Sequence, residues 1–207
     1  MRKPVPSATI QCGLMNNPKV ESKWKCLSLM AVLVAGGLLV SCAAMAVDST
    51  GHFSRAKLAW DKGEYDQALA EYQAVINQTG EDAAARHNRA LIYLEMGRAS
   101  DARDEAVRAV QLAPAEGRYH LTYGVALMLL REPDLAGAKE QLLASIRPMK
   151  YDKDASGLLR VYYNLGLVSQ QSRLIVDARK WYRMALAIDP NDEATLTALA
   201  SLEGRER

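Results

Sequence analysis

The stretch Tyr162-Tyr-Asn-Leu-Gly166, followed by Ala178-Arg-Lys-Trp-Tyr-Arg-Met-Ala185 and closed by Pro190, decides the fold of this chain. Small residues stand where one helix would pack on another: Gly166 midway along a first helix, Ala178 in a second helix, and Ala185 where the next pair would dock. Proline cannot continue a helix, so Pro190 ends the second one. The stretch therefore predicts two antiparallel helices that cannot bury their apolar faces alone.

The same arrangement recurs along the chain at a regular interval. The segment Lys62-Gly-Glu-Tyr-Asp-Gln-Ala68 is repeated in outline as Met96-Gly-Arg-Ala-Ser-Asp-Ala102. Pro148 and Pro190 are farther apart than the repeat interval of about 34 residues. We assign the extra residues between them to a charged spacer near Met149–Ser156. A period of about 34 residues, as here, is typical of a solenoid of stacked helical pairs.

These residues resemble the tetratricopeptide-repeat (TPR) family, whose pattern is W-x2-L-G…A-x3-F…P. The last full repeat carries the resemblance most completely, through Tyr162, Leu165, Gly166, Ala178, Tyr182, Ala185 and Pro190. Ser169 departs from the pattern, because the family prefers tyrosine there. In the second repeat Arg86 and Arg89 replace the usual apolar pair, and in the third Glu132-Pro-Asp134 lengthens the turn between the helices.

The resemblance implies an all-α fold, a TPR solenoid of four helix-turn-helix repeats with a C-terminal capping helix. We expect the TPR domain to cover residues 50–204, with repeats at about 50–82, 83–116, 117–148 and 159–192 and the cap at 193–203. Hydrophobic residues make up 49% of the chain but aromatic residues only 6%, a composition rich in alanine and leucine that suits closely packed helices. The cysteines are Cys12, Cys26 and Cys42; all of them precede the repeats, which therefore need no disulfide.

The N-terminal part of the chain has the layout of a secretory signal. No residue in the range Cys26–Val47 is charged, and Lys23 and Lys25 precede this largely apolar run. A positive segment followed by an apolar one and then by small residues is typical of a signal peptide. The run contains Leu39-Val-Ser-Cys42, which resembles the lipobox of bacterial lipoproteins. In that family the cysteine is acylated and the chain is cut just before it.

The lipobox resemblance predicts a signal peptide over residues 1–41, lipidation of Cys42 and a lipidated linker over residues 42–49. Several acyl chains on one cysteine are enough for stable membrane anchoring. A start at Met15 would leave residues 1–14 untranslated. The charges before the apolar run should stay in the cytoplasm, which sends the repeats across the membrane.

Two other fates of the apolar run stay open. Ala44-Met-Ala46 fits the A-x-A cleavage site of ordinary secretion, which would release a soluble periplasmic protein starting at Val47. Alternatively, the uncharged run Cys26–Val47 is not cut and spans the bilayer, since about 20 apolar residues are enough.

Charge and motifs exclude several classes of function. From Cys42 onward the chain holds 21 Lys and Arg against 23 Asp and Glu without a basic run, so we expect no nucleic-acid partner. The sequence has no G-x-S-x-G, H-E-x-x-H, Walker or G-x-G-x-x-G motif. Its three histidines, His52, His87 and His120, are far apart. We therefore expect no enzyme activity, catalytic residue, metal, cofactor or small-molecule substrate.

The TPR resemblance places a peptide-binding groove on the concave surface, where the first helices of the repeats line it. The corresponding positions here are Trp60, His87, Asn88, Leu91, Leu94, Arg118, Leu121, Val125, Met128, Tyr163, Asn164 and Leu167, with Lys57, Asp61, Glu95, Thr122, Arg160, Gln170 and Gln171 beside them. An apolar centre with a polar rim suits an amphipathic helix or an extended peptide. Leu91, Val125 and Leu167 fall at equivalent positions and are expected to form one apolar line. The alternative is that such leucines pack between repeats.

Small TPR lipoproteins of this layout resemble pilotins and pilus-assembly factors, above all the TadD-type protein of tight-adherence (Flp) pilus systems. The resemblance implies a lipid-anchored scaffold on the periplasmic face of the outer membrane. Such a scaffold helps to assemble an Flp or type IV pilus or a secretion apparatus, with an outer-membrane secretin or another pilus component as its partner. Inner-membrane anchoring is an alternative, although Ala43 is not the aspartate that favours it. The alternative function is a scaffold for peptidoglycan enzymes, outer-membrane proteins or exopolysaccharide machinery.

Overall fold

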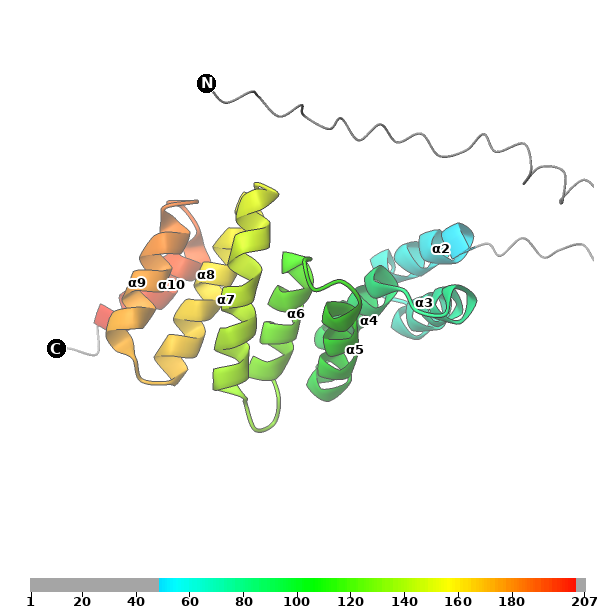
Figure 1. Cartoon of the computed structure of the whole chain (residues 1–207). Helices are drawn as coiled ribbons and strands as arrows, with labels where there is room; N and C mark the ends of the chain where they lie inside the picture. Colours follow the sequence, from blue (N-terminus) through cyan, green and yellow to red (C-terminus); the bar gives the residue numbers. More distant parts are fainter. Residues whose placement is uncertain (1–48, 204–207) are drawn as a thin grey trace, which may run out of the picture. The chain divides into compact units, whose positions relative to one another are not determined.

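The computed structural model describes residues 49–203, so the predicted signal peptide and Cys42 lie outside the described residues. Within 49–203 the chain forms α-helices and no strand, which confirms the all-α prediction. The helices follow one another across short connections and are stacked in chain order (Figure 1). They are α2 (Ser49–Asp61), α3 (Tyr65–Thr79), α4 (Ala83–Glu95), α5 (Ala99–Leu112), α6 (Gly117–Met128), α7 (Leu135–Tyr151), α8 (Ala155–Gln171), α9 (Ile175–Leu186) and α10 (Glu193–Glu203).

The helices pair two by two along the chain. The pairs α2–α3, α4–α5, α6–α7 and α8–α9 have the most extensive contacts, and each pair packs on the next through consecutive helices. First helices of neighbouring pairs also touch each other, α4 with α6 and α6 with α8. The last helix, α10, packs on α9 in the place of a further first helix. The described residues therefore form the predicted four pairs and terminal helix.

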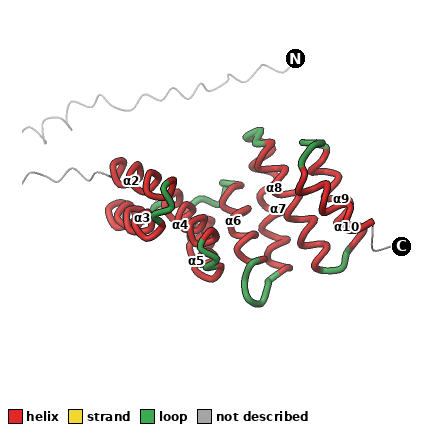
Figure 2. The backbone as a smooth tube through the Cα atoms, turned by 180° about the vertical axis from the view of Figure 1, so that it is seen from behind, coloured by secondary structure: helices red, strands yellow, loops and turns green. Residues whose placement is uncertain are grey.

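The turns inside the first, second and fourth pairs each contain one residue with a positive φ. Gly63 and Gly97 have φ values of 77° and 72°, in the left-handed region that glycine enters without a steric penalty. Arg173 takes the same place in the last pair with φ 60°. The turn between α6 and α7 is longer, as predicted, and ends at Asp134, whose carboxylate accepts a hydrogen bond from the backbone N–H of Gly137 at 2.9 Å. Figure 2 shows it as the large loop between these two helices.

Small residues stand where the two helices of a pair cross. In the second pair Ala90 of α4 and Ala102 of α5 are completely buried. In the third pair a Cβ added to Gly124 would lie 2.9 Å from Cγ of Leu142. The absence of a large side chain at these points lets the two helix backbones approach each other, as the repeat pattern predicts.

The charged spacer predicted near Met149–Ser156 is mostly helical, which corrects that prediction. Helix α7 continues through Pro148 to Tyr151, and α8 begins at Ala155. Met149 follows the proline directly and is only 2% exposed, so its packing in the core favours continuation of the helix. Asp154 then begins α8 by accepting a hydrogen bond from the N–H of Gly157 at 2.8 Å. The extra residues therefore lengthen these two helices.

A polar network replaces the apolar pair that the second repeat lacks. Arg86 and Arg89 of α4 both bind Glu105 of α5, at 3.0 and 3.1 Å, and these three side chains are only 13–17% exposed. Arg86 also binds Glu81 at 2.6 Å, and Arg89 donates a hydrogen bond to Gln73 of α3. The arginines thus join three consecutive helices through charged hydrogen bonds.

The apolar core is divided into three clusters. One takes its buried residues from α2, α3 and α4, a larger one from α6, α7, α8 and α9, and a small one from α9 and α10. Between the first two clusters, α5 contributes only the buried alanines Ala102, Ala106 and Ala109. On its α5 side, the joint between the second and third pairs is therefore made mainly of small side chains, whereas the polar network joins α5 to α3 and α4.

Candidate partner-binding groove

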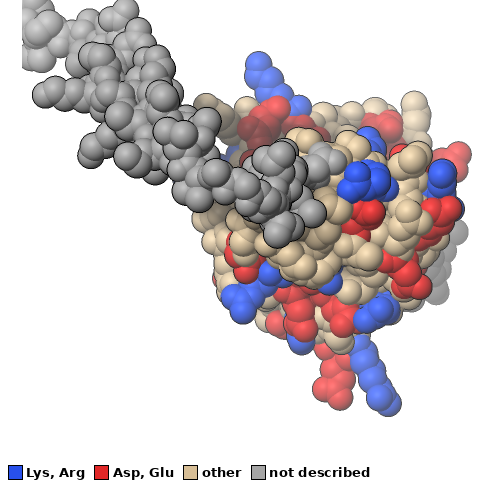
Figure 3. All heavy atoms as spheres, turned by 90° about the vertical axis from the view of Figure 1, so that its right-hand side faces the viewer, with Lys and Arg blue, Asp and Glu red and all other residues tan. Residues whose placement is uncertain are grey.

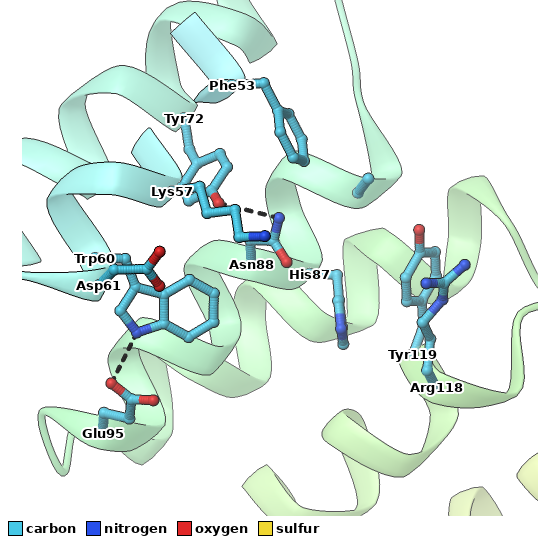
Figure 4. Close-up of a pocket in the computed structure, with 11 residues that line it drawn as sticks. Phe53, Lys57, Trp60, Asp61, Tyr72, His87, Asn88, Glu95, Arg118 and Tyr119 are labelled. Atoms are coloured by element: carbon cyan, nitrogen blue, oxygen red, sulfur yellow. Dashed lines mark hydrogen bonds between the residues drawn. The ribbon is translucent and has the colours of Figure 1, made fainter. Parts of the chain in front are cut away.

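The first helices α4, α6 and α8 contact one another in succession, and two of the hollows of the described residues lie along the first helices and α10. The larger measures about 640 Å³ and lies between α2, α4 and α6. We call it the N-terminal hollow (Figure 4); it is lined by Phe53, Lys57, Trp60, Asp61, Tyr72, Ala84, His87, Asn88, Glu95, Arg118 and Tyr119.

Aromatic rings held by hydrogen bonds form the walls of the N-terminal hollow. Phe53 and Tyr72 meet edge to face, with ring centroids 5.2 Å apart. The side-chain amide of Asn88 donates a hydrogen bond to the Tyr72 hydroxyl at 3.2 Å. Across the hollow, the Trp60 indole N–H donates to Glu95 at 2.8 Å and joins α2 to α4. These contacts fix the side chains before any ligand arrives, which lowers the entropic cost of binding.

His87 lies in the N-terminal hollow and is only 9% exposed. Its ring packs on Tyr119 at a centroid distance of 4.7 Å, and its Nδ1 atom is buried without a hydrogen-bond partner. Burial, and then the positive charges of Arg118 and Arg160, lower the pKa of His87 from 6.5 to about 4. The imidazole is therefore neutral at physiological pH and adds a polar but uncharged group to the hollow.

The second hollow lies between α8 and α10 and measures about 510 Å³. We call it the C-terminal hollow; it is lined by Tyr163, Leu167, Gln170, Glu193, Ala194, Thr197, Ala198 and Ser201. The capping helix α10 thus supplies one wall of the groove, a role that the sequence did not indicate. It can do so because it occupies the position that the first helix of a fifth pair would take.

The structure divides the predicted groove residues into three groups. Those that line a hollow are Lys57, Trp60, Asp61, His87, Asn88, Glu95, Arg118, Tyr163, Leu167 and Gln170. Those that are half-buried or exposed outside the hollows are Leu91, Leu94, Val125, Arg160, Asn164 and Gln171. Those that are buried are Leu121, Thr122 and Met128, at 3%, 4% and 8% exposure.

The buried group corrects the expectation of an apolar groove centre. Leu121 and Met128 belong to the large core cluster, and Val125 and Leu167 pack against it. Their side chains fill the space between repeats, so the accessible surface is more aromatic and polar than the sequence predicted. Phe53, Tyr72 and Tyr119, which sequence reasoning missed, also line the N-terminal hollow, although Tyr72 and Tyr119 are only 1% and 5% exposed.

Neither a metal site nor a membrane-spanning helix occurs in residues 49–203. No three His, Cys, Asp or Glu side chains there are arranged to hold a metal ion. None of the described helices combines the length and the apolar character that crossing a bilayer requires. Charged side chains of both signs are mixed over the end of the molecule seen in Figure 3. That mixture differs from the continuous basic surface by which proteins bind nucleic acids.

Two family models match the chain, one described as a TPR repeat over residues 59–97 and one as a tetratricopeptide repeat over residues 87–148. The fold is a tetratricopeptide-repeat solenoid. Proteins with such repeats bind protein partners and are typically non-catalytic scaffolds. Comparison with curated protein sequences gave no match.

Several solved protein structures are similar to this one. A crystal structure of MamA is 19% identical, with a TM-score of 0.65 over 76% of this chain and 82% of its own. The pilF protein of Pseudomonas aeruginosa is 21% identical, with a TM-score of 0.67 over 77% of this chain and 69% of its own. The TPR2B domain of yeast Sti1, solved in a complex with pHsp70, is 20% identical, with a TM-score of 0.55 over 59% of this chain and 97% of its own. At these identities the likeness shows the fold alone.

Proposed function

We propose that this chain is a non-catalytic scaffold of the bacterial envelope, held at the outer membrane through Cys42. Its groove binds a segment of a partner protein during assembly of a pilus or secretion apparatus. The observation that carries the binding function is the N-terminal hollow. Three first helices converge on it, its aromatic walls are held by hydrogen bonds, and its polar groups face the space left for a ligand.

The role in pilus or secretion assembly is supported by the layout of the sequence, in which a segment that resembles a lipobox at Cys42 precedes a short linker and the repeats. The solenoid of pilF from Pseudomonas aeruginosa is similar to this one in fold over most of this chain. An outer-membrane secretin or another pilus component is the partner that fits this proposal.

Site-specific photocrosslinking in the native cell tests the proposal. The crosslinker p-benzoylphenylalanine replaces Lys57, an exposed residue of the N-terminal hollow, and in a matched variant it replaces Gln67. Gln67 is exposed on α3 in the same repeat and does not line either hollow of the groove. We expect covalent adducts from position 57 and none from position 67.

The adducts identify the partner by mass spectrometry. A secretin or a pilus subunit at position 57 supports the assembly function. Peptidoglycan hydrolases or outer-membrane insertion proteins at that position would replace the pilus role by an envelope-scaffold role. Adducts from position 67 alone would mean that the groove is not the binding surface.

A further inference from the structure

The second helices differ in charge between the two halves of the solenoid. Helices α3 and α5 contain two arginines and five carboxylates, whereas α7 and α9 contain six Lys and Arg and only two carboxylates, Glu140 and Asp177. All six bases are exposed or partly exposed. We call them the basic face; they are Lys139, Arg147 and Lys150 of α7 and Arg179, Lys180 and Arg183 of α9.

Neighbouring groups do not neutralise the basic face. Within residues 49–203, five of its members form no ion pair: Lys139, Arg147, Lys150, Lys180 and Arg183. The carboxylates of Asp134, Asp154 and Asp189, at or near helix ends, accept backbone N–H groups at 2.8–2.9 Å. Glu132 and Asp152 lie in the turns, and each adjoins an arginine or lysine in the sequence. The basic face therefore keeps a net positive charge.

Aliphatic side chains stand among these bases. Leu143 is 41% exposed and lies one helical turn from both Lys139 and Arg147, on the same stripe of α7. Val176 is 80% exposed and lies one turn before Lys180 on α9. Val176 also belongs to a hollow of about 510 Å³, lined by Val176, Arg179, Lys180, Arg183, Met184 and Ala187. The basic face thus offers positive charge and accessible apolar surface together.

The basic face lies away from the groove. Helices α7 and α9 both pack on α8 and occupy the same place in successive pairs, so their exposed stripes face the same general direction. Figure 1 shows the two helices on either side of α8. No residue of α7 or α9 lines the N-terminal or the C-terminal hollow. A surface that covers the basic face therefore leaves the groove open.

We infer that the basic face rests on an anionic phospholipid surface, that of the membrane to which Cys42 anchors the chain. Anionic headgroups attract Lys and Arg held within a few ångströms of them, and exposed aliphatic side chains enter the boundary between headgroups and acyl chains. The stretch from Cys42 to Ser49 spans at most about 25 Å when fully extended, so the anchor keeps the domain close to the bilayer. This proximity favours a membrane over an acidic protein as the partner of the basic face. The inference rests on the proposed function, because it needs the anchor.

Photocrosslinking to lipid in nanodiscs tests the inference. The full chain is produced in a bacterium that acylates lipoproteins and is placed in nanodiscs of phosphatidylcholine, either alone or with about 30% phosphatidylglycerol as the anionic lipid. The crosslinker p-benzoylphenylalanine replaces Leu143, and in a matched variant it replaces Gln67. Gln67 is exposed on the second helix of the first pair, which directly follows the linker, so the anchor alone cannot favour position 143 over position 67. Mass spectrometry measures the lipid adducts.

We expect adducts from position 143 in the anionic nanodiscs to exceed those from position 67 by about fivefold or more, since each base near an anionic surface contributes about fivefold to binding. Screening by about 0.5 M NaCl should remove most of this excess. Lys180→Gln/Arg183→Gln should lower the adducts from position 143 by about fivefold or more. Arg103→Gln/Arg108→Gln removes the same charge from α5 and should leave them unchanged. Circular dichroism checks that both double variants are folded.

Retention on the nanodiscs separates failure of this inference from failure of the anchor. If the chain is retained but positions 143 and 67 give equal adducts, or if phosphatidylglycerol has no effect, the anchor stands and the inference is wrong. If the chain is not retained and gives no lipid adduct, both the anchor and the inference are wrong. A protein adduct in place of a lipid adduct at position 143 in the native cell would show that the basic face binds a protein partner, which also contradicts the inference.

Discussion

The ring of Tyr182 lies against the backbone of Gly166 so closely that a methyl group at position 166 would overlap three of its carbon atoms. The ring cannot move aside easily, because Tyr182 is completely buried and its hydroxyl donates a hydrogen bond to Gln170 at 2.8 Å. Helices α8 and α9 therefore meet at a distance that only glycine permits.

Gly166→Ala should destabilise the domain, although alanine favours a helix elsewhere. The expected loss is about 1–3 kcal/mol, as for overpacking in a core. Denaturant unfolding followed by circular dichroism measures it. In a Tyr182→Leu background the same substitution should be neutral or stabilising, because the ring that opposes the methyl group is gone. An equal loss in both backgrounds would show that this contact does not limit the helix spacing.

Glu105→Gln should destabilise the packing of α4 on α5. The substitution leaves Arg86 and Arg89 with a neutral partner in a site that is only 13–17% exposed. We expect a loss of about 1–3 kcal/mol in the free energy of unfolding. The matched control is Asp104→Asn on the same helix, whose ion pair with Arg103 is 66% exposed at the aspartate and should contribute less than about 1 kcal/mol. Similar losses in both variants would contradict a special role for Glu105.

His87 should make the stability of the domain depend on pH. Its pKa is about 4 in the folded chain and 6.5 when unfolded, so between these values the unfolded chain binds a proton that the folded chain does not. The free energy of unfolding should therefore fall as the pH is lowered from 6.5 to 4, by up to about 3 kcal/mol. His87→Phe keeps the ring against Tyr119 but cannot titrate. Urea unfolding across this range should show a shallower pH dependence for the variant, and parallel curves would refute the assignment.

Arg173→Gly should stabilise the domain. Arg173 has φ 60° at the place where the first two pairs have Gly63 and Gly97. Glycine removes the strain of the left-handed backbone, which should stabilise the folded chain by more than the extra conformational entropy that glycine loses on folding destabilises it. We therefore expect the free energy of unfolding to rise by about 0.5–1 kcal/mol. Gly97→Ala is the reciprocal test: a Cβ there meets nothing within 4 Å, so any loss of stability reports backbone strain alone. A gain from Gly97→Ala would contradict this explanation.

Cys42→Ala should abolish membrane anchoring if Cys42 is the lipidated residue. Wild type should incorporate radiolabelled palmitate and partition into the detergent phase, and the variant should do neither. A variant of full length that stays in the membrane would instead indicate an uncut N-terminal helix. A wild-type protein that starts at Val47 and remains soluble would indicate cleavage after Ala46.

Most of the fold could be predicted from the repeat period, because few residue types fit at the positions that set the spacing between helices. Gly166 and Ala178 could be assigned to a helix crossing from sequence alone, since larger side chains cannot fit there. The helical course through Pro148 could not be predicted, because the packing of Met149 beyond the proline comes from tertiary contacts. The role of Arg86 and Arg89 was hidden for the same reason: their partner Glu105 lies on another helix.

The groove was only partly predictable. Helical periodicity shows which side of a first helix avoids its second helix, and it correctly brought Trp60 and Asn88 together. Periodicity does not distinguish residues on the accessible surface of the groove from residues that face the neighbouring first helix. Leu121 and Met128 fall on that boundary and are buried there. Tyr72 was missed because it reaches the hollow from a second helix.

The alanine-lined joint at α5 has a consequence for cooperativity. The two apolar clusters on either side of it are connected through α5 mainly by buried alanines, because the Glu105 network joins α5 only to α3 and α4. We therefore expect the free energy that resists their separation to be lower than that within either cluster. Amide hydrogen exchange in α2–α4 is then governed by partial opening rather than by global unfolding. The N-terminal hollow spans this joint, since α2 and α4 line one side and Tyr119 of α6 the other. A bound partner therefore ties the two halves together and makes the domain unfold as one unit.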